Sequence, residues 1–216
     1  MTCSGDRLFA AYREVLDERG ILFVSDEVQT GWGRTGEHFW GISAHGVVPD
    51  AMTFAKGLAG GYAIGGVVAR GDLMDCLTAN SISTFGGNPV STVAASAVLD
   101  VVLSQDLQGN ALKLGTTLLT GLRDVADRCP LIGEVRGKGL MIGIELVGAD
   151  GYTPDAAAAA EVLEQTRRRG LLVGKGGLYG NVLRLAPPLN LSSDEAEEGL
   201  GILTSALEAV DRDRRS

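Results

Sequence analysis

The chain carries, at residues 21–26, the apolar run Ile21-Leu22-Phe23-Val24-Ser25-Asp26, which ends on a carboxylate. Because no polar residue interrupts residues 21–24, we predict a parallel strand that is covered on both faces. A second short run, Thr53-Phe54-Ala55, ends on Lys56 and enters the turn Gly57-Leu58-Ala59-Gly60-Gly61. The sequence therefore predicts a buried carboxylate and a buried amine, each at the carboxyl end of a strand.

Elements on either side of these runs complete an α/β order. Upstream, apolar residues recur at helical spacing over residues 6–19, and Gly20 stands where helices commonly end. Downstream, the pattern predicts strands over residues 51–54 and 64–69. Asn88 and Pro89 are typical of a helix N-cap and first helical position, and they predict a helix that runs to about Leu103.

The second half of the chain continues the same order. The apolar pattern predicts a helix over residues 107–128, a strand over 140–146, an alanine-rich helix over 154–169, strands over 171–173 and 182–185, and a closing helix. Ser192 and Glu195 have the spacing of a capping box at the start of that closing helix. We therefore divide the chain into residues 1–106 and residues 107–216, a bridging helix followed by a smaller α/β domain.

The composition is that of a soluble globular protein. Hydrophobic residues make up 45% and charged residues 21% of the 216 residues, and the formal net charge is −8. This acidic balance argues against nucleic acid or an anionic membrane as a partner. The three cysteines are far apart and lack metal-ligand spacing, which indicates a reducing compartment and no metal site. Without a signal peptide or a membrane-spanning run, we expect a cytoplasmic protein.

A carboxylate and an amine at strand ends are what pyridoxal phosphate chemistry needs. A lysine forms a Schiff base with the cofactor aldehyde, and a carboxylate keeps the pyridine nitrogen protonated. Each signal alone is weak, because Asp26 also suits a structural cap and most lysines are solvated. A strand ending in Asp26-Glu27 is also found in P-loop ATPases. That alternative fails because neither Gly137-Lys138 nor Gly174-Lys175 is followed by Ser or Thr.

Two further stretches carry chemistry. The segment Ser83-Thr84-Phe85-Gly86-Gly87-Asn88-Pro89 places a hydroxyl and backbone N–H groups before a helix, which suits an anion site or a plain capped loop. Arg184 lies inside an apolar run that ends in two prolines. Such an arginine is costly unless its guanidinium meets a carboxylate, which belongs either to this chain or to a substrate.

Together these stretches resemble the class III, pyridoxal-phosphate-dependent aminotransferases, above all the ω-amino-acid and alanine–glyoxylate branch. The resemblance covers the chain from about Phe9 to the closing helix. Its motifs are Ile21-Leu22-Phe23-Val24-Ser25-Asp26-Glu27-Val28-Gln29-Thr30-Gly31, Lys56-Gly57, Thr84-Phe85-Gly86-Gly87-Asn88-Pro89 and Arg184-Leu185-Ala186-Pro187-Pro188. It implies the aspartate-aminotransferase fold (fold type I), with residues 1–106 as part of the large cofactor domain and a small C-terminal α/β domain after it.

The resemblance also implies roles for individual residues toward pyridoxal 5'-phosphate. Asp26 would bind the pyridine nitrogen and Val28 would pack on the ring face. Gln29 would approach the phenolic oxygen, and Lys56 would form the Schiff base. Thr84 would reach the phosphate of the neighbouring subunit's cofactor, which implies a homodimer.

By the same resemblance, the reaction is a ping-pong transamination. Arg184 would hold the substrate carboxylate. An amino acid of the ω-amino-acid, 4-aminobutyrate or alanine type would donate the amino group, and an α-keto acid would accept it. The motifs present leave open a pyridoxal phosphate enzyme of another reaction type, an aminomutase or a decarboxylase.

The chain departs from the family pattern by an absence. Family members carry a long segment before the helix at residues 8–16, which supplies a Gly/Ser-rich phosphate loop, an aromatic residue on the cofactor and strands of the main sheet. We therefore expect a C-terminal portion with unpaired strand edges at residues 21–24 and 64–69 and with weak cofactor binding. A separately encoded N-terminal half would complete it; otherwise the chain is a catalytically silent fragment.

Overall fold

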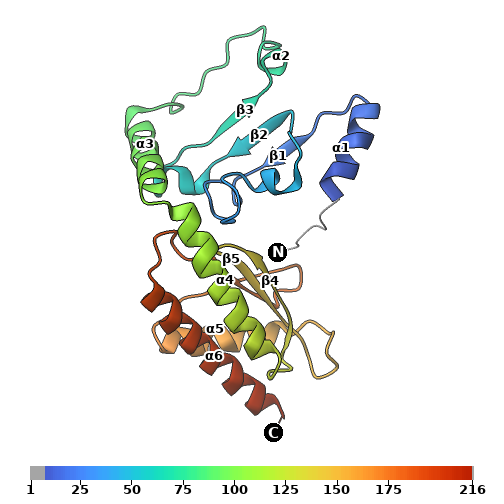
Figure 1. Ribbon diagram of the computed structural model, residues 1–216, viewed down its shortest axis with the longest axis vertical. Coiled ribbons are helices and arrows are strands. Elements are labelled where there is room, and N and C mark those ends of the chain that lie inside the picture. Colours follow the sequence, from blue (N-terminus) through green and yellow to red (C-terminus); the bar gives the residue numbers. More distant parts are fainter. Residues whose placement is uncertain (1–7, 216) are drawn as a thin grey trace. The chain divides into compact units, whose positions relative to one another are not determined.

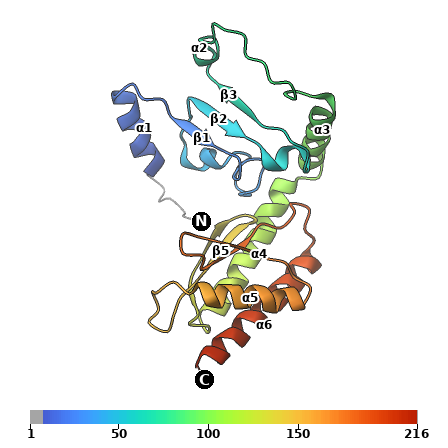
Figure 2. The same ribbon diagram turned by 180° about the vertical axis from the view of Figure 1, so that it is seen from behind.

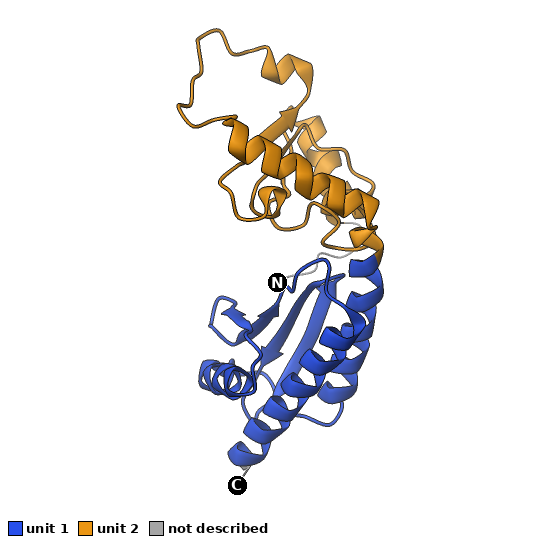
Figure 3. Ribbon diagram, turned by 90° about the vertical axis from the view of Figure 1, so that its left-hand side faces the viewer, with its two compact units in different colours: residues 1–3, 110–216 blue, residues 4–109 orange. Residues whose placement is uncertain are grey.

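The computed structural model describes residues 8–215 (Figure 1). These residues form two compact units, one that ends at Gly109 and one that begins at Asn110 (Figure 3). Each unit has its own sheet and its own helices. The two units are therefore described separately, the first over residues 8–109 and the second over residues 110–215.

The first unit is built on a three-stranded sheet with the order β1-β2-β3 (Figure 1). Strand β1 (Val24–Asp26) pairs in parallel with β2 (Ala51–Phe54), and β2 pairs antiparallel with β3 (Gly66–Ala69). The helices of this unit are α1 (Leu8–Glu18), α2 (Gly71–Met74) and α3 (Pro89–Ser104), with short 3-10 helices η1 (Gly41–His45) and η2 (Lys56–Ala59).

The sheet of the first unit has open edges. Strands β1 and β3 each pair with one neighbour, so the prediction of unpaired edges is confirmed. Val67 and Val68 of β3 are both exposed. Because successive strand residues face opposite sides, their exposure shows that β3 is uncovered on both faces. The prediction of a strand covered on both faces at residues 21–24 is wrong, since Ile21, Leu22 and Val24 are about half exposed.

The sequence around Asn88 explains where α3 begins. Asn88 Oδ1 accepts a hydrogen bond of 3.0 Å from the backbone N–H of Ser91, and Pro89 occupies the first helical position. Proline suits that position because its missing N–H would be unpaired in any residue there. The predicted helix over residues 89–103 is therefore confirmed.

The second unit contains a four-stranded antiparallel sheet with the order β4-β5-β7-β6. Its strands are β4 (Ile132–Lys138), β5 (Met141–Leu146), β6 (Gly174–Gly176) and β7 (Val182–Leu185). Its helices are α4 (Leu107–Ala126), α5 (Ala156–Arg168) and α6 (Ser193–Arg215). The boundary between the units falls within α4, and α5 and α6 lie together in both views (Figures 1 and 2).

One apolar face of this sheet forms the core of the second unit. Ile142, Ile144 and Leu146 alternate along β5, so their side chains share a face, and all three are buried. Leu183 of β7 pairs with Ile144 and adds to the same face. Helices α4, α5 and α6 all contribute buried side chains to this core. Its continuity explains why these elements form one compact body.

Two strand predictions in the second unit differ from the structure. The strand expected over residues 171–173 lies at Gly174–Gly176, because Gly174 is the residue that pairs with Arg184 of β7. Strand β4 was not predicted, since its sequence mixes glycine and charged residues. The capping box is confirmed, because Ser192 N donates to Glu195 Oε2 over 2.8 Å and Glu195 N donates to Ser192 Oγ over 3.2 Å.

Within residues 8–215, no single helix is both long and apolar enough to cross a membrane. Helices α3 and α4 meet these two criteria only when they are taken together as a pair.

Candidate functional site

The carboxylate of Asp26 lies at the carboxyl end of β1. Its Oδ1 accepts hydrogen bonds from the backbone N–H of Val28 over 3.1 Å and from Thr53 Oγ1 over 3.2 Å. The parallel register also pairs Asp26 with Thr53 of β2. The carboxylate is therefore oriented by two donors, one on its own turn and one on the neighbouring strand.

Lys56 follows β2 and begins η2. Because β1 and β2 are parallel, their carboxyl ends lie at one edge of the sheet, and this edge carries both Asp26 and Lys56. Lys56 has a φ of 49°, in the left-handed region that residues with a side chain rarely adopt. The structure thus brings the predicted acid and amine to one edge, with the lysine backbone in an unusual conformation.

The burial predicted for these two groups is wrong in this structure. Asp26 and Lys56 are both exposed. The sheet that carries them has only three strands, and within residues 8–215 its carboxyl edge is not covered. The acid and the amine are in place, whereas a dry pocket around them is not formed by the described residues of this chain.

Val28 and Gln29 follow Asp26 in the loop after β1. Val28 is partly buried, and its backbone N–H holds Asp26, so this residue helps to orient the acid. Gln29 is exposed on the same loop. The roles predicted for both residues toward a cofactor ring stay predictions.

Thr84 lies in an exposed turn before α3. The turn is closed by a hydrogen bond of 3.1 Å from Gly86 N to Ser83 O, and Thr84 and Phe85 are both exposed. Its place just before a helix N-terminus suits an anion contact. The predicted contact with a phosphate in a neighbouring subunit stays a prediction.

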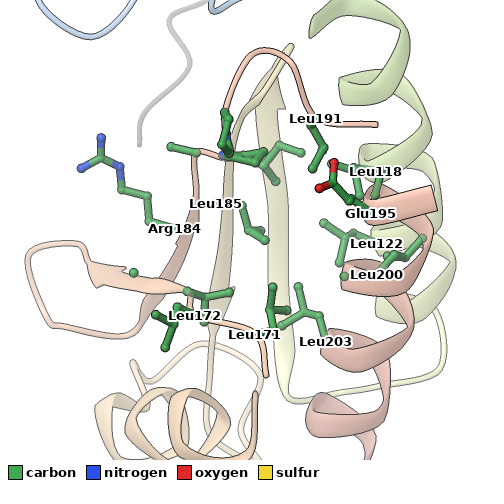
Figure 4. Close-up of a pocket in the computed structure, with 18 residues that line it drawn as sticks. Leu118, Leu122, Leu171, Leu172, Arg184, Leu185, Leu191, Glu195, Leu200 and Leu203 are labelled. Atoms are coloured by element: carbon green, nitrogen blue, oxygen red, sulfur yellow. The ribbon is translucent and has the colours of Figure 1, made fainter. Parts of the chain in front are cut away.

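Arg184 lies in the second unit, at the middle of β7. It is exposed, so the cost expected for a cation within an apolar strand does not arise. Its partners on the neighbouring strands are Gly143 of β5 and Gly174 of β6, and neither of them places a side chain beside it. Figure 4 shows the Arg184 side chain directed away from the leucine cluster.

A cavity of about 450 Å³ lies beside β7, and Arg184 is one of the residues that line it. Apolar side chains form most of its wall, among them leucines from α4, α6, β7 and the adjoining loops, and Glu195 is directed toward it (Figure 4). Glu195 also closes the capping box with Ser192, whose backbone N–H lowers the pKa of this carboxyl. The cavity is thus a mainly apolar space beside a structural cap, and Arg184 lies at its border with the side chain directed away from the leucines.

Sequence reasoning missed the two carboxylates that organise the first unit. Glu27 is buried and accepts hydrogen bonds from both ends of the loop after β1. Asp50 is also buried and accepts from Arg13, Arg70 and the backbone N–H of Phe23. The signal that could have found them is a charged residue next to an apolar strand, which is paired whenever it is buried.

The hydrogen bonds of Asp50 set its charge state. The backbone N–H of Phe23 and the guanidinium of Arg13 hold the pKa of Asp50 below its ordinary value. The carboxylate therefore ties α1, the approach to β1 and the end of β3 together at the edge opposite Lys56. This cluster stabilises the scaffold and does not reach the predicted site.

The residues at the carboxyl edge fit pyridoxal phosphate by the chemistry of their donor set. A primary amine and an oriented carboxylate both lie at this edge, which matches the two groups that the cofactor requires. Within residues 8–215, no group of three His, Cys, Asp or Glu side chains is arranged to hold a metal ion. The arrangement thus suits carbonyl–amine chemistry.

Comparison with known proteins points the same way. The family model described as aminotransferase class-III matches residues 1–207. Alanine–glyoxylate aminotransferase 2 homolog 2 of Arabidopsis thaliana is 45% identical over 88% of this chain and 40% of its own length. 4-Aminobutyrate aminotransferase GabT of Escherichia coli is 41% identical over 91% of this chain and 46% of its own length. An alanine/serine racemase of Pyrococcus horikoshii is 39% identical over 94% and 42%.

A solved structure of an aminotransferase is also similar to this chain. The ornithine aminotransferase of Toxoplasma gondii, which has partial occupancy of pyridoxal phosphate at its active site, matches with a TM-score of 0.86 and 29% identity. The match covers 96% of this chain and 48% of that protein. The chain thus spans less than half the length of the curated relatives it matches.

Proposed function

The chain belongs to the class-III aminotransferase family, and from that membership we propose that it supplies the lysine, the acid and the substrate arginine of a pyridoxal-phosphate-dependent transaminase. The observation that carries the proposal is the position of Asp26 and Lys56 at one carboxyl edge of parallel strands. A family match alone would hold for a chain in which either group was lost. Here both are present, and the acid is oriented by two hydrogen bonds.

The residues of the chain have distinct tasks in this proposal. Bound pyridoxal phosphate would supply the aldehyde and the electron-withdrawing ring that make the Cα–H bond of an amino acid acidic. Asp26, held through Oδ1, would keep a proton on the pyridine nitrogen. Val28 and Gln29 would line the ring and its phenolic oxygen. The Nζ atom of Lys56 would accept the proton released at the substrate and later return it.

Arg184 would bind a substrate carboxylate in the same proposal. Its guanidinium presents parallel N–H groups that match the two oxygens of a carboxylate. Gly143 and Gly174 on both sides leave room for a ligand next to the guanidinium. Support for the substrate class comes from the relatives, which are aminotransferases for alanine and glyoxylate or for 4-aminobutyrate by their names. We propose an amino acid of that kind as donor and an α-keto acid as acceptor.

We further propose that this chain works with additional protein. The relatives are more than twice as long as the region matched, and the open β1 and β3 edges and the exposed Val67 and Val68 offer surface for further strands. A homodimer, in which Thr84 serves the neighbouring subunit, or a separately encoded N-terminal half would provide it. Without such a partner the chain would be catalytically silent, because its candidate site is exposed.

A second function within the same chemistry has one specific observation in its favour. The relative from Pyrococcus horikoshii, which is 39% identical to this chain, is an alanine/serine racemase and not an aminotransferase by its name. Racemisation needs the same amine and acid but no keto-acid acceptor. The two functions are separated by following whether an amino group leaves the donor.

The test is covalent trapping of the lysine. The purified chain is mixed with pyridoxal phosphate and reduced with borohydride, and the added mass is located by peptide mass spectrometry. The chain has four lysines, so Lys113, Lys138 and Lys175 act as internal controls for Lys56. We expect the adduct on Lys56, its loss in Lys56→Ala and its persistence in Lys175→Ala. No adduct, or label spread evenly over the lysines, would overturn the proposal.

A further inference from the structure

Glu27 has an unusual environment for a carboxylate. Its side chain is 1% exposed, and each of its oxygens accepts one hydroxyl and one backbone N–H. Oε1 accepts from Ile42 N over 2.7 Å and from Ser25 Oγ over 3.2 Å. Oε2 accepts from Gly41 N over 2.9 Å and from Thr30 Oγ1 over 2.5 Å. Four donors thus replace the water that burial removes.

Ser25 lies in β1, and the other three donors lie at the two ends of one loop. Thr30 stands where the loop leaves β1, and Gly41 and Ile42 begin η1, where the loop returns. One carboxylate therefore closes the loop over residues 30–42. Because the donors on both oxygens include backbone N–H groups, an amide side chain in this place would direct its NH₂ at one of them in either orientation.

The loop carries Trp32, which packs against the turn that holds Lys56. The Trp32 ring lies 5.5 Å from the Phe54 ring, centroid to centroid, with the planes near perpendicular. Trp32 also packs on the small cluster that contains Leu58 and Ala59 of η2. A Cβ atom at Gly57, the residue after Lys56, would lie 3.9 Å from Trp32 Cδ1. The indole is thus in contact with the lysine turn from β2 through η2.

The backbone of this region needs external support. Trp32 and Lys56 have φ values of 62° and 49°, which are costly for residues with side chains, about 1–3 kcal/mol each. Such conformations persist only where the surroundings impose them. Trp32 Nε1 is buried and has no hydrogen-bond partner among the described residues, so packing and the loop closure hold the ring.

We propose that Glu27 and Trp32 are positioning residues for Lys56: the buried carboxylate closes the loop, the loop holds the indole, and the indole holds the lysine turn. The inference rests on the proposed function for the chemical role of Lys56. Both oxygens of Glu27 are bound by protein donors, so in this proposal it acts through the loop and not on the substrate or cofactor. Its contribution is to fix the direction of the amine, which matters because a displacement of about 1 Å at a reacting group costs up to about a hundredfold in rate.

The primary test compares Glu27→Gln with Glu18→Gln, the same substitution at an exposed position of α1 in the same unit. The readout is the borohydride-trapped pyridoxal phosphate adduct on Lys56 relative to that on Lys175. We expect the ratio to fall on the order of tenfold in Glu27→Gln and to stay unchanged in Glu18→Gln. An unchanged ratio in Glu27→Gln would overturn the inference while leaving the proposed function intact.

A second readout does not depend on the cofactor. Amide hydrogen exchange over residues 54–60 should accelerate in Glu27→Gln, whereas exchange in β5 and α6 of the second unit should not change. Exchange over residues 54–60 that matches the parent chain would contradict the inference. If the parent chain forms no Lys56 adduct at all, the proposed function fails, and this exchange measurement alone decides whether Glu27 supports the turn.

Tryptophan fluorescence tests whether Glu27 holds Trp32 in place. Both tryptophans of the chain lie in this loop, at positions 32 and 40, so Trp40→Phe leaves Trp32 as the sole reporter. Adding Glu27→Gln should shift its emission to longer wavelength as the indole becomes hydrated. Thr30→Val is the milder variant, because it removes one donor and keeps the side-chain shape; it should give the same changes to a smaller extent. If Glu27→Gln fails to fold, Thr30→Val becomes the test. Adduct formation, hydrogen exchange and Trp32 emission that all match the parent chain in Thr30→Val would then contradict the inference.

Discussion

The two units of this chain are stabilised in different ways. The second unit has a continuous core of 22 buried apolar residues drawn from three helices and the sheet. The corresponding cluster in the first unit has three, Leu58, Ala59 and Ala95. The first unit instead relies on two buried carboxylates, Glu27 and Asp50, and on an aromatic group around Trp32. The unit that carries the lysine is thus the one whose own apolar core is small.

This difference shows which unit has the smaller apolar core within the described residues. Exposed apolar side chains gather on the sheet of the first unit, whereas the second sheet buries Ile142, Ile144, Leu146 and Leu183 on its inner face. Hydrophobic burial is the main favourable contribution to folding, so the second unit should be the more stable of the two. Four measurements test this comparison.

The largest expected difference is in thiol reactivity, because each unit carries one cysteine of known exposure. Cys76 is exposed in the first unit and Cys129 is buried in the second. With Cys3 replaced by serine, a thiol reagent should modify Cys76 at once. Cys129 should react on the order of a thousandfold more slowly, since it reacts only when the second unit opens. Similar rates, followed by mass spectrometry, would show that the second unit is not independently stable.

The next test removes core volume. Leu207→Ala on α6 should lower the free energy of unfolding of the second unit by about 2–5 kcal/mol, because Leu207 is fully buried. Leu178→Ala, at a position 91% exposed, should change it by less than about 0.5 kcal/mol. Leu58→Ala in the first unit should cost less than Leu207→Ala, since its cluster is small. Denaturant-dependent hydrogen exchange reports each unit separately. If Leu58→Ala lowered the free energy of unfolding as much as Leu207→Ala does, the two units would not differ in their apolar cores.

Acid should unfold the first unit through Asp50. Hydrogen bonds from Phe23 N–H and Arg13 lower the pKa of this carboxyl from its ordinary value of 3.8. Its stabilisation is therefore complete above about pH 3.8 and is lost as the pH falls through the lowered pKa. Tryptophan fluorescence, which reports the first unit alone, should show this transition.

Variants at Asp50 separate its effect from general acid unfolding. Asp50→Asn should be destabilised already at neutral pH and should show a weaker acid dependence, because the charge is absent at every pH. Asp100→Asn, at an exposed position of α3, is the matched control and should behave like the parent chain. A normal acid transition in Asp50→Asn would show that other carboxyls hold the unit.

The smallest effect is expected at the start of α6. Ser192→Ala removes the hydroxyl that accepts from Glu195 N and should lower the stability of the second unit by about 0.5–2 kcal/mol. Ser205→Ala, within the same helix, should be close to neutral, because the Ser205 hydroxyl only bonds back to Gly201 O. A larger loss at Ser205 than at Ser192 would refute the capping assignment.

Most elements of the fold could be predicted from local sequence. Asn88-Pro89 and the Ser192–Glu195 box mark helix starts because their side chains and ring act within one turn of the chain. Strand β4 could not be found in this way. Its glycines and charges give no apolar run, and it forms because β5 offers hydrogen bonds along its length. Pairing of that kind is decided between strands and not within them.

The candidate site, too, could be predicted only in part from local sequence. The types of residue at Asp26, Lys56, Thr84 and Arg184, and the family they indicate, follow from motifs of a few neighbouring positions. Their exposure does not, because burial depends on which strands and helices cover a sheet. The prediction of a buried acid and a buried amine was wrong for that reason, although both groups do lie at one edge.

The amino-acid sequence by itself determined the α/β order, the helix caps and the chemistry of the lysine and the acid, since these depend on contacts within a few residues. Only the tertiary structure decided that Glu27 closes the loop behind Lys56 and that Asp50 joins three segments. It also decided that the core gathers in the second unit. Those features depend on groups that are distant along the chain and meet only when the sheets have formed.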